Sequence, residues 1–433
     1  MALHSNDTDW IVQLNEQQSW EKWSIYRVPT HVTDNNRMAY RPLAVSFGPY
    51  HHGEEHLLPM EEHKYRALHR FLTRSGKPFE HFLESLRAVV GDLMASYVML
   101  DPEWIDGGEG TVRRFLQLMI TDGCFMLEIL RYATDRGNDY EPNDPIFSNY
   151  GMVYIMKHIR RDMLVLENQL PMLVLDRLVA AESNEPQQSR IQRTDITPTT
   201  QDKDLIIRLI LNFCSLGTHT ARMGKCLHVL DVVRNSLLYN VEKTNIPHEQ
   251  DVGSEKIIQS AVELNYAGIR FEKSKTNSLR DISYARGVLR LPVIEVEDTT
   301  ESVFLNLIAF ERFHIGAGYE VTSFISFMED IIANERDVEL LQTRGIIRNA
   351  MGSEKAVAEL FHSLSKDVAL DPESSLDAVR KRLKSYCQKP WIMWKANLIR
   401  TYFGNPWAVW SLIAAIFALA LSIIQTAYTV LKP

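Results

Sequence analysis

The sequence YIMKHIRRDMLVLENQLPMLVLDRL, residues 154–178, decides the fold class of this chain. Its apolar side chains recur at helical spacing and cover more than one face, which is typical of a helix at the centre of a protein. Proline at position 171 has no backbone N–H to donate, so we expect it to kink or split that helix. The stretch therefore predicts a helical core.

Helical periodicity continues on both sides of this stretch. Pro59 stands where it can open a helix, and Glu61 and Glu62 then occupy the first turn, where the helix dipole favours acidic side chains. Apolar residues recur at the same spacing along most of the remaining chain. We expect helices within residues 82–94, 112–120, 205–216, 225–239, 304–312, 324–333, 338–344 and 354–364.

Two segments depart from the helical pattern. Residues 266–271 and 287–297 alternate apolar and polar side chains and are rich in β-branched residues, which predicts the strands of a small sheet. The chain shows no internal repeat. The soluble part is therefore expected to be one large helical domain with a small β element.

The last apolar run, residues 407–431, contains no charged side chain. A helix needs about 20 residues to cross a hydrocarbon core of roughly 30 Å, so this run is long enough to span a bilayer. Trp407, Trp410 and Tyr428 stand where interfacial aromatic residues are expected. A buried core helix is the alternative, although such helices seldom run this long without a charge. The expected fold class is thus mainly α, with a single C-terminal transmembrane helix as membrane anchor.

Composition changes mark the expected divisions of the chain. Residues 1–22 form a polar tail, and residues 23–400 form the helical domain. Within it, residues 181–204 are polar and rich in Pro, Ser and Thr, which predicts a mobile loop. Residues 376–403 predict a basic amphipathic helix, and we expect it to lie on the anionic leaflet beside the anchor at 407–431.

The charge and targeting signals indicate a location and limit the partners. The net charge of −8 argues against nucleic acid as a partner, because phosphate binding needs a basic face. The N-terminus has no signal peptide, and basic residues gather before the anchor, so we expect the bulk of the chain in the cytosol. The membrane is either the plasma membrane or the endoplasmic reticulum, and an outward-facing domain is the alternative orientation. The cysteines, at 124, 214, 226 and 387, have no disulfide or metal spacing, which fits a reducing compartment.

The densest group of metal-capable side chains is His51, His52 and His56, in the sequence HHGEEH. Histidine and carboxylate are ligands for zinc or iron. A Gly-Pro turn precedes the group and Gly53 interrupts it, which argues against a helical two-histidine site, and the His-Glu-x-x-His motif is absent. We favour a turn whose histidines bond to the backbone. A metal-dependent enzyme is the alternative, and no cofactor is predicted.

Acidic residues inside apolar runs are the other candidates for chemistry. Two such carboxylates in one cavity can perform general acid–base catalysis, but a buried acid is more often held by backbone amides or an arginine. Glu167, Asn168 and Gln169, just before Pro171, fit this structural role, since their side chains can take up backbone groups freed at the kink. No nucleophile motif or phosphate-binding loop is present, so no catalytic residue is predicted. The acids in question are Asp122, Glu128, Asp162, Glu167 and Glu311.

Several segments, in order along the chain, resemble one family of plant proteins, the "domain of unknown function 247" family. The segment VSFGPYHHG, residues 45–53, contains Gly48, Pro49 and Tyr50 at its turn. The segment DMLVLENQLP, residues 162–171, contains Glu167, Asn168, Gln169 and Pro171. The resemblance extends over about residues 23–431. It also includes IYRVP at 25–29, LRLP at 289–292 and YFGNPW at 402–407.

The resemblance implies a mostly helical plant protein with one C-terminal transmembrane helix and no assigned biochemical activity. Pollen-expressed members of the family resemble male determinants of self-incompatibility in grasses. We therefore expect a membrane-anchored interaction or recognition module with a protein partner, and pollen–stigma self-incompatibility as one biological setting. The alternative is a membrane-bound metal-dependent enzyme that uses the turn at residues 51–56. A purely structural membrane adaptor is a third interpretation.

Overall fold

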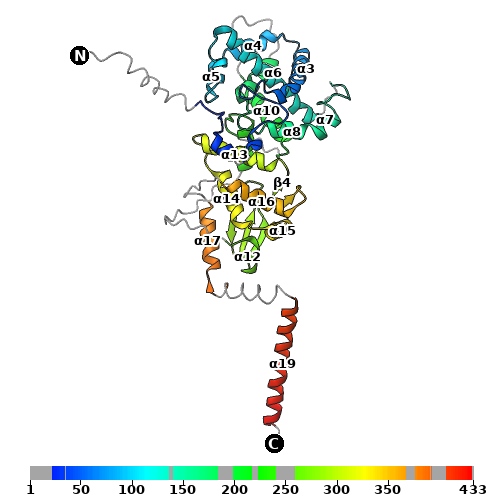
Figure 1. Cartoon of the computed structure of the whole chain (residues 1–433), viewed down its shortest axis with the longest axis vertical. Coiled ribbons are helices and arrows are strands. Elements are labelled where there is room, and N and C mark those ends of the chain that lie inside the picture. The colour runs from blue at the N-terminus through cyan, green and yellow to red at the C-terminus, as the bar shows by residue number, and fades with distance from the viewer. Residues whose placement is uncertain are drawn as a thin grey trace, which may run out of the picture. The chain divides into compact units, whose positions relative to one another are not determined.

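The computed structural model describes residues 22–34, 36–135, 140–183, 198–216, 223–239, 259–366, 376–390, 392 and 406–431. Residues 1–21 of the predicted tail at 1–22, most of the predicted loop at 181–204 and residues 393–403 of the predicted basic helix lie outside these ranges. The side chains of Trp407 and Tyr428 also lie outside the description. Within the described residues the protein is mainly helical with two small sheets, which confirms the mainly α part of the predicted class (Figure 1).

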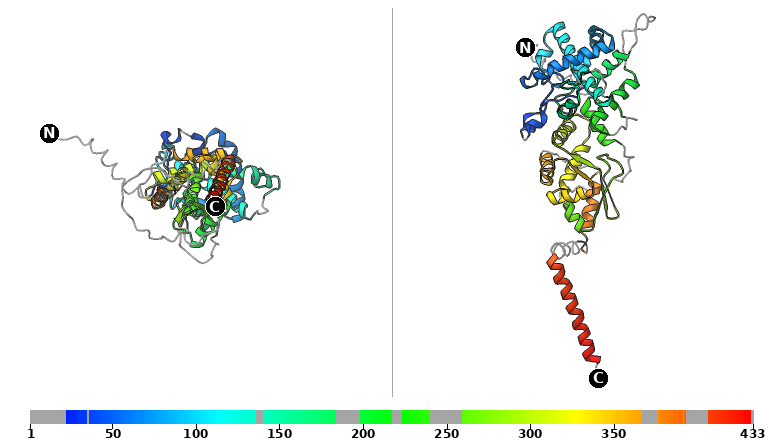
Figure 2. Two further views of the ribbon diagram at one scale, coloured as in Figure 1. Left: turned by 90° about the horizontal axis from the view of Figure 1, so that it is seen from below. Right: turned by 90° about the vertical axis from the view of Figure 1, so that its right-hand side faces the viewer.

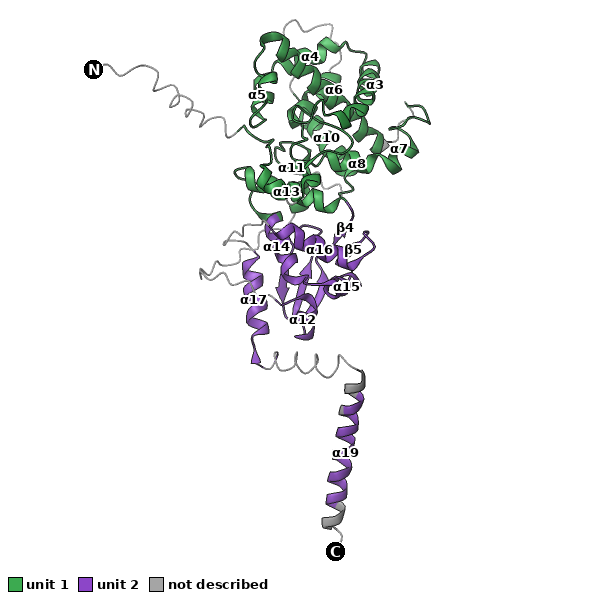
Figure 3. Cartoon of the chain, in the orientation of Figure 1, with its two compact units in different colours: residues 1–239, 299–321 green, residues 240–298, 322–433 purple. Residues whose placement is uncertain are grey.

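The chain forms two compact units (Figure 3). Unit 1 contains residues 1–239 and 299–321, and unit 2 contains residues 240–298 and 322–433. Each unit is therefore built from two separate parts of the sequence. No composition change marks this division within residues 23–400, because the chain leaves and re-enters unit 1 between ordinary secondary-structure elements.

Unit 1 is built around the long helix α6 (Gly108–Asp135), which contacts α3, α4, α9 and α10 (Figures 1 and 2). Phe115, Phe125 and Leu130 on this helix are completely buried, so α6 occupies the centre expected for residues 154–178. The other helices among the described residues of unit 1 are α2 (Thr30–Thr33), η2 (Arg37–Tyr40), η3 (Glu55–Leu57), α3 (Leu58–Ser75), α4 (Phe79–Arg87), α5 (Val90–Ala95), η4 (Pro102–Trp104), α7 (Asn149–Tyr154), α8 (Met156–Asp162), α9 (Met172–Ser183), α10 (Thr200–Phe213), α11 (Val229–Leu238) and α13 (Thr300–Phe313).

Helix boundaries in unit 1 follow local capping rules. Helix α3 has proline in its first turn and ends at Gly76, whose φ of 65° suits the left-handed cap position. Helix α10 begins with a capping box, in which the Thr199 hydroxyl and the Asp202 carboxylate bond to each other's backbone N–H. The single stripe predicted over residues 82–94 is divided between α4 and α5, because the chain turns at Ala88 and Val89.

The stretch that predicts the helical core is split, as Pro171 led us to expect. Helix α8 ends at Asp162, and α9 begins at Met172, directly after the proline. The break is therefore much wider than a proline kink. Residues 163–171 between the two helices leave the helical path and carry the polar side chains described in the next subsection.

Unit 2 combines helices with two small sheets. In the larger sheet β3 is central, pairing parallel to β1 and antiparallel to β2; in the smaller one β4 and β5 are parallel. The predicted strand at 287–297 becomes β3 and β4, separated at Pro292, which cannot donate a ladder hydrogen bond. The strand predicted at 266–271 begins only at Arg270. The elements are α12 (Ala261–Tyr266), β1 (Arg270–Lys273), β2 (Ser283–Ala285), β3 (Val288–Leu291), β4 (Ile294–Val296), α15 (Glu335–Thr343), β5 (Ile347–Asn349), α16 (Glu354–Ser365), α17 (Asp377–Cys387) and α19 (Pro406–Leu431), with α14 (Glu320–Ile331) entering from unit 1.

The C-terminal region contains two described helices. Helix α17 covers the first part of the predicted basic helix, and α19 covers the predicted anchor as one unbroken helix (Figures 1 and 2). A search of the described residues finds no helix with the length and apolarity that crossing a membrane requires. The transmembrane anchor therefore stays a prediction.

Candidate functional site

The segment Leu43–Gly48 in unit 1 is irregular, with bends at Leu43, Ala44 and Gly48, and belongs to neither sheet. Its backbone N–H groups are bonded by side chains instead. The Asp162 carboxylate accepts hydrogen bonds from the N–H groups of Leu43 at 2.9 Å, Ala44 at 2.6 Å and Val45 at 3.0 Å. Asp162 is completely buried, and the N–H donors stabilise its charge there. Burial raises its pKa, and these bonds oppose the rise.

Asn168 and Asp122 continue this pattern along the segment. The Asn168 side-chain oxygen accepts from the Phe47 N–H at 2.7 Å, and its nitrogen donates to the carbonyls of Val45 and Asp162, both at 3.0 Å. Asp122 accepts from the Gly48 N–H at 2.9 Å. We call Asp122, Asp162 and Asn168 the clamp. The clamp side chains form the hydrogen bonds to the backbone of this segment that no neighbouring strand among the described residues provides.

Gln169 secures the break between α8 and α9. Its side-chain nitrogen donates to the carbonyls of Met163 and Val165, both at 2.7 Å, and its oxygen accepts from the Leu230 N–H at 3.1 Å. The structure thus places Asn168 and Gln169 on the backbone groups that the broken helix leaves exposed. The three residues whose backbone groups bond to the Gln169 amide are buried. Each of these hydrogen bonds therefore replaces one that the backbone group would make with water in the unfolded chain.

A buried ion cluster lies beside the clamp. The Lys64 ammonium is completely buried and lies 2.8 Å from Asp122 Oδ1, 2.6 Å from Glu61 Oε1 and 3.0 Å from Ser46 Oγ. Burial raises the pKa of Asp122, while the lysine lowers it. We did not select Lys64 from the sequence, although one signal was available. It occupies the apolar face of α3, between Met60 and Ala67, where an unpaired charge is too costly.

Two histidines of the predicted turn, His51 and His56, lie beside one carboxylate, with His56 Nδ1 3.7 Å from Glu54 Oε2. His51 Nδ1 lies 2.7 Å from Glu54 Oε1, and His51 Nε2 lies 3.6 Å from Glu167 Oε2. His56 bonds to the Pro42 carbonyl at 3.2 Å, and the His52 ring packs edge-on against Trp104. Among the described residues, no three histidine, cysteine or acidic side chains form a group that could hold a metal ion.

The remaining acids that we selected also have close partners. Glu167 accepts from the Val28 N–H at 2.5 Å, and burial raises its pKa. Glu128 pairs with Arg74 and accepts from the Tyr140 hydroxyl at 2.8 Å. Asp162 pairs with an arginine as well as with backbone N–H groups, since Arg161 lies 2.9 Å from it. Glu311 pairs with Arg234, at 2.7 Å, and accepts from the Val321 N–H. Each acid therefore has a structural role in unit 1.

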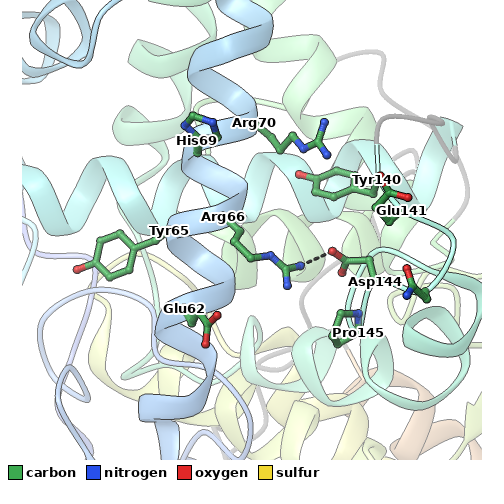
Figure 4. Close-up of a pocket in the computed structure, with 10 residues that line it drawn as sticks. Glu62, Tyr65, Arg66, His69, Arg70, Tyr140, Glu141, Asp144 and Pro145 are labelled. Carbon is green, nitrogen blue, oxygen red and sulfur yellow. Dashed lines mark hydrogen bonds and ion pairs between the residues drawn. The ribbon is translucent and has the colours of Figure 1, made fainter.

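The concave site in unit 1 is a surface pocket of about 900 Å³ between α3 and the segment 140–145 (Figure 4). The α3 residues belong to the outward face of the helix, opposite the buried Lys64 and Phe71. Its lining combines tyrosines, arginines, a histidine and carboxylates. These residues are Glu62, Tyr65, Arg66, His69 and Arg70 from α3, and Tyr140, Glu141, Asn143, Asp144 and Pro145.

Two sets of contacts hold the residues that line this pocket in place, one at Asp144 and one at Tyr140. Arg66 pairs with Asp144, whose other oxygen accepts from the N–H groups of Ile146 and Phe147, each at 2.8 Å. The Tyr140 ring stacks on Phe147 with a centroid separation of 3.9 Å. The Arg70 guanidinium lies 5.7 Å from the Tyr140 centroid and points toward it in Figure 4. The pocket therefore presents a positioned guanidinium over a fixed aromatic ring.

Comparison with known proteins identifies the family. A family model described as "plant protein of unknown function" (DUF247) matches residues 25–421. The chain belongs to the DUF247 family. Two Arabidopsis thaliana proteins are similar to it over 97% of its length. UPF0481 protein At3g47200 is 31% identical, with 89% of its own length matched, and putative UPF0481 protein At3g02645 is 20% identical, with 94% matched. No solved structure matches the chain.

In this DUF247 protein, the two segments that carry the clearest resemblance meet in space. Residues 45–53 include most of the segment Leu43–Gly48, and residues 162–171 supply Asp162 and Asn168 of the clamp. The tyrosine and proline around Gly48 turn the chain beside this contact. Tyr50 donates to the Val98 carbonyl, and its ring lies under the Arg27 guanidinium at 4.3 Å. The motifs therefore describe how unit 1 folds and give no sign of a reaction.

A substitution at Gly48 tests how closely the chain packs beside the clamp. The φ of Gly48 is 73°, and an added Cβ would lie 2.8 Å from the Tyr97 hydroxyl and 2.9 Å from the Gln169 carbonyl. We expect Gly48→Ala to lower the free energy of unfolding by about 3 kcal/mol, since strain and close contact add. Gly53→Ala is the matched control: its φ is 82°, but nothing lies within 4 Å of the new Cβ. Urea unfolding should show a loss of only about 1 kcal/mol there; equal losses would contradict a tight clamp.

Asp176 on α9 is a buried acid that we did not select from the sequence. Its Oδ1 has no hydrogen-bond partner among the described residues, and burial raises its pKa from 3.8 to about 6. The folded DUF247 chain thus binds this proton more tightly than the unfolded chain, and the favourable contribution is lost as pH rises through 6. We expect Asp176→Asn to raise the free energy of unfolding by about 2 kcal/mol at pH 7.5 and to change little at pH 4.

Urea unfolding at the two pH values checks this expectation. The control is Asp204→Asn on the exposed side of α10, which should have no effect at either pH. A less stable Asp176→Asn variant at pH 7.5 would show that the carboxylate is needed in its charged form.

Proposed function

We propose that this DUF247 chain is a membrane-anchored recognition protein that binds a protein partner at the α3 pocket. One observation carries the proposal: the pocket presents Arg70 over Tyr140, with Tyr65 60% exposed on the same helix. Tyrosine and arginine are the side chains that most often dominate binding energy at protein interfaces. The rigid stacking of Tyr140 on Phe147 reduces the entropy lost on binding.

The charges of the pocket indicate what the partner presents. Arg66 and Asp144 neutralise each other, which leaves Glu62 and Arg70 as the charged groups that α3 contributes to the lining, and Glu141 adds a second carboxylate. Glu62 and Arg70 are eight residues apart, on the order of 12 Å along the helix axis, so each acts on a different part of a bound segment. A partner segment with an acidic group near Arg70 and a basic group near Glu62 complements this surface.

The proposal places α19 in a lipid bilayer. Its described side chains are apolar and exposed: Trp410 is 68%, Phe417 67% and Ile424 64% accessible. Contiguous apolar surface of this kind costs free energy in water and marks an interaction surface. The charge distribution supports a cytosolic location for the bulk of the chain. The family resemblance supports pollen–stigma self-incompatibility as the setting, so stigma and pollen membranes are the first preparations to test.

The metal-dependent enzyme has no observation in its favour. His51 and His56 both lie beside the Glu54 carboxylate, while the His52 ring packs against Trp104, and among the described residues no group of three such side chains could hold a metal ion. The buried carboxylates likewise bond to backbone groups and cations. A recognition surface therefore accounts for the pocket more simply than a catalytic centre does.

Photo-crosslinking in native membranes tests recognition at the pocket. The full chain would carry p-benzoylphenylalanine at Tyr65, and a control chain would carry it at Tyr319, another exposed tyrosine of unit 1 outside the pocket lining. We expect a discrete cross-linked product from position 65 and none from position 319. Equal products from both positions, or none from position 65, would overturn the assignment.

A further inference from the structure

The outward face of α17 is basic. Lys381 and Arg382 on the helix and Lys389 just after it are exposed, with Ser385 between them. The opposite stripe, Val379, Leu383 and Cys387, is buried. We call Lys381, Arg382 and Lys389 the basic face.

Contacts within unit 2 fix the direction of this face. Arg380 Nε donates to Asp330 Oδ2 at 2.9 Å, and its other nitrogens donate to Ser326 at 3.1 Å and Asp377 at 3.2 Å. Its guanidinium also lies 5.6 Å from the Phe327 ring. Arg380 thus faces inward and holds α17 in place, although the sequence analysis grouped it with the residues 376–403 expected to lie on the anionic leaflet. The basic face is therefore positioned before any partner binds.

The surrounding sequence strengthens this charge. Asp377 is the last acidic residue of the chain, and eight lysines and arginines follow it, in a protein whose net charge is −8. The one acid of α17 is neutralised by Arg380. The residues after Asp377 thus carry positive charge without any acidic side chain, although most of the 47 lysines and arginines lie earlier in the chain.

We propose that the basic face of α17 docks onto an anionic lipid surface, an inference that rests on the membrane location proposed for α19. The residues between Cys387 and Pro406 can span on the order of 60 Å when extended, so α17 can reach the headgroups wherever α19 enters. Each basic side chain near an anionic surface strengthens association by about fivefold, which makes three positioned side chains a substantial second attachment. Phosphatidylserine headgroups supply the matching charge.

The test uses the full chain with Ser385→Cys carrying a fluorophore on the basic face. Vesicles of pure phosphatidylcholine are compared with vesicles containing one part in five phosphatidylserine, each with a nitroxide-headgroup lipid as quencher. Flotation of the chain with the pure phosphatidylcholine vesicles reports α19. Quenching at position 385 reports α17.

We expect phosphatidylserine to increase quenching and 0.5 M salt to reverse the increase, because salt screens the attraction. The triple variant K381E/R382E/K389E should weaken this docking by more than about tenfold. The control R336E/R344E/R348E makes the same charge change at exposed positions elsewhere in unit 2 and should retain it. Quenching that is independent of phosphatidylserine, or equally reduced by both triple variants, would overturn the inference. Failure to float with phosphatidylcholine, with phosphatidylserine-dependent quenching retained, would remove the α19 anchor and leave the docking of α17 intact.

Discussion

Replacing Asp162 with alanine is expected to lower the free energy of unfolding by about 4 kcal/mol, enough to unfold a marginally stable domain. The carboxylate accepts from three consecutive backbone N–H groups, and alanine leaves all three without that acceptor, two of them part-buried and the third, of Val45, fully buried. It also leaves the Arg161 guanidinium without its carboxylate partner. Urea unfolding followed by circular dichroism measures the loss.

Two further variants separate the clamp from a general effect of charge. Asp162→Asn keeps one acceptor oxygen and should lose about half as much stability. Asp106→Ala removes an exposed acid of unit 1 and should stay within about 0.5 kcal/mol of wild type. A stable Asp162→Ala protein would mean that the segment 43–48 is held by other contacts.

Replacing Lys64 with methionine is expected to cost about 4 kcal/mol at pH 7.5. The change leaves Asp122 buried beside Glu61 with no cation between them. Burial already raises the pKa of Asp122, and loss of the lysine raises it further. A group with a raised pKa in the folded state favours folding as pH falls, so the deficit should shrink between pH 8 and pH 5.

A double-mutant cycle gives the coupling between the two groups. Lys64→Met combined with Asp122→Asn removes both charges, and we expect the double variant to lose less stability than the two single variants together, by about 2 kcal/mol. The exposed Lys157 on α8 provides the control, since Lys157→Met should be nearly neutral. Strictly additive losses would show that Lys64 and Asp122 do not stabilise each other.

The helical class and the break at Pro171 could be predicted because they depend on local chemistry. Apolar spacing and the missing proline N–H act within a few residues. The role of Asn168 and Gln169 was also accessible, since a broken helix leaves backbone groups that nearby amides can bond. The spacing of residue types along the sequence does not identify hydrogen-bond partners that are far apart in the chain. Val28 and Glu167 are separated by 139 positions, and Leu43 and Asp162 by 119.

The sequence contains weaker signals for the pocket and for the division into two units. Tyr65, Arg66 and Arg70 are ordinary residues for the exposed face of a helix, and only the fold brings them opposite Tyr140. Lys64 is different, because its position on the apolar face of α3 was visible in the sequence and implied a buried partner. The division into two units depends on contacts between distant parts of the chain, which composition does not record.

The most direct test of recognition at the α3 pocket is to measure Arg70→Glu in two ways on the same preparation. Arg70 contacts the Tyr140 ring at the surface and lies outside the clamp, so its replacement should leave the free energy of unfolding within about 0.5 kcal/mol of wild type. Cross-linking from position 65 should fall by about tenfold or more, as expected for a charged residue at the centre of an interface. An unchanged cross-linking yield, or a loss of stability that accounts for the missing product, would contradict the proposed role of the pocket.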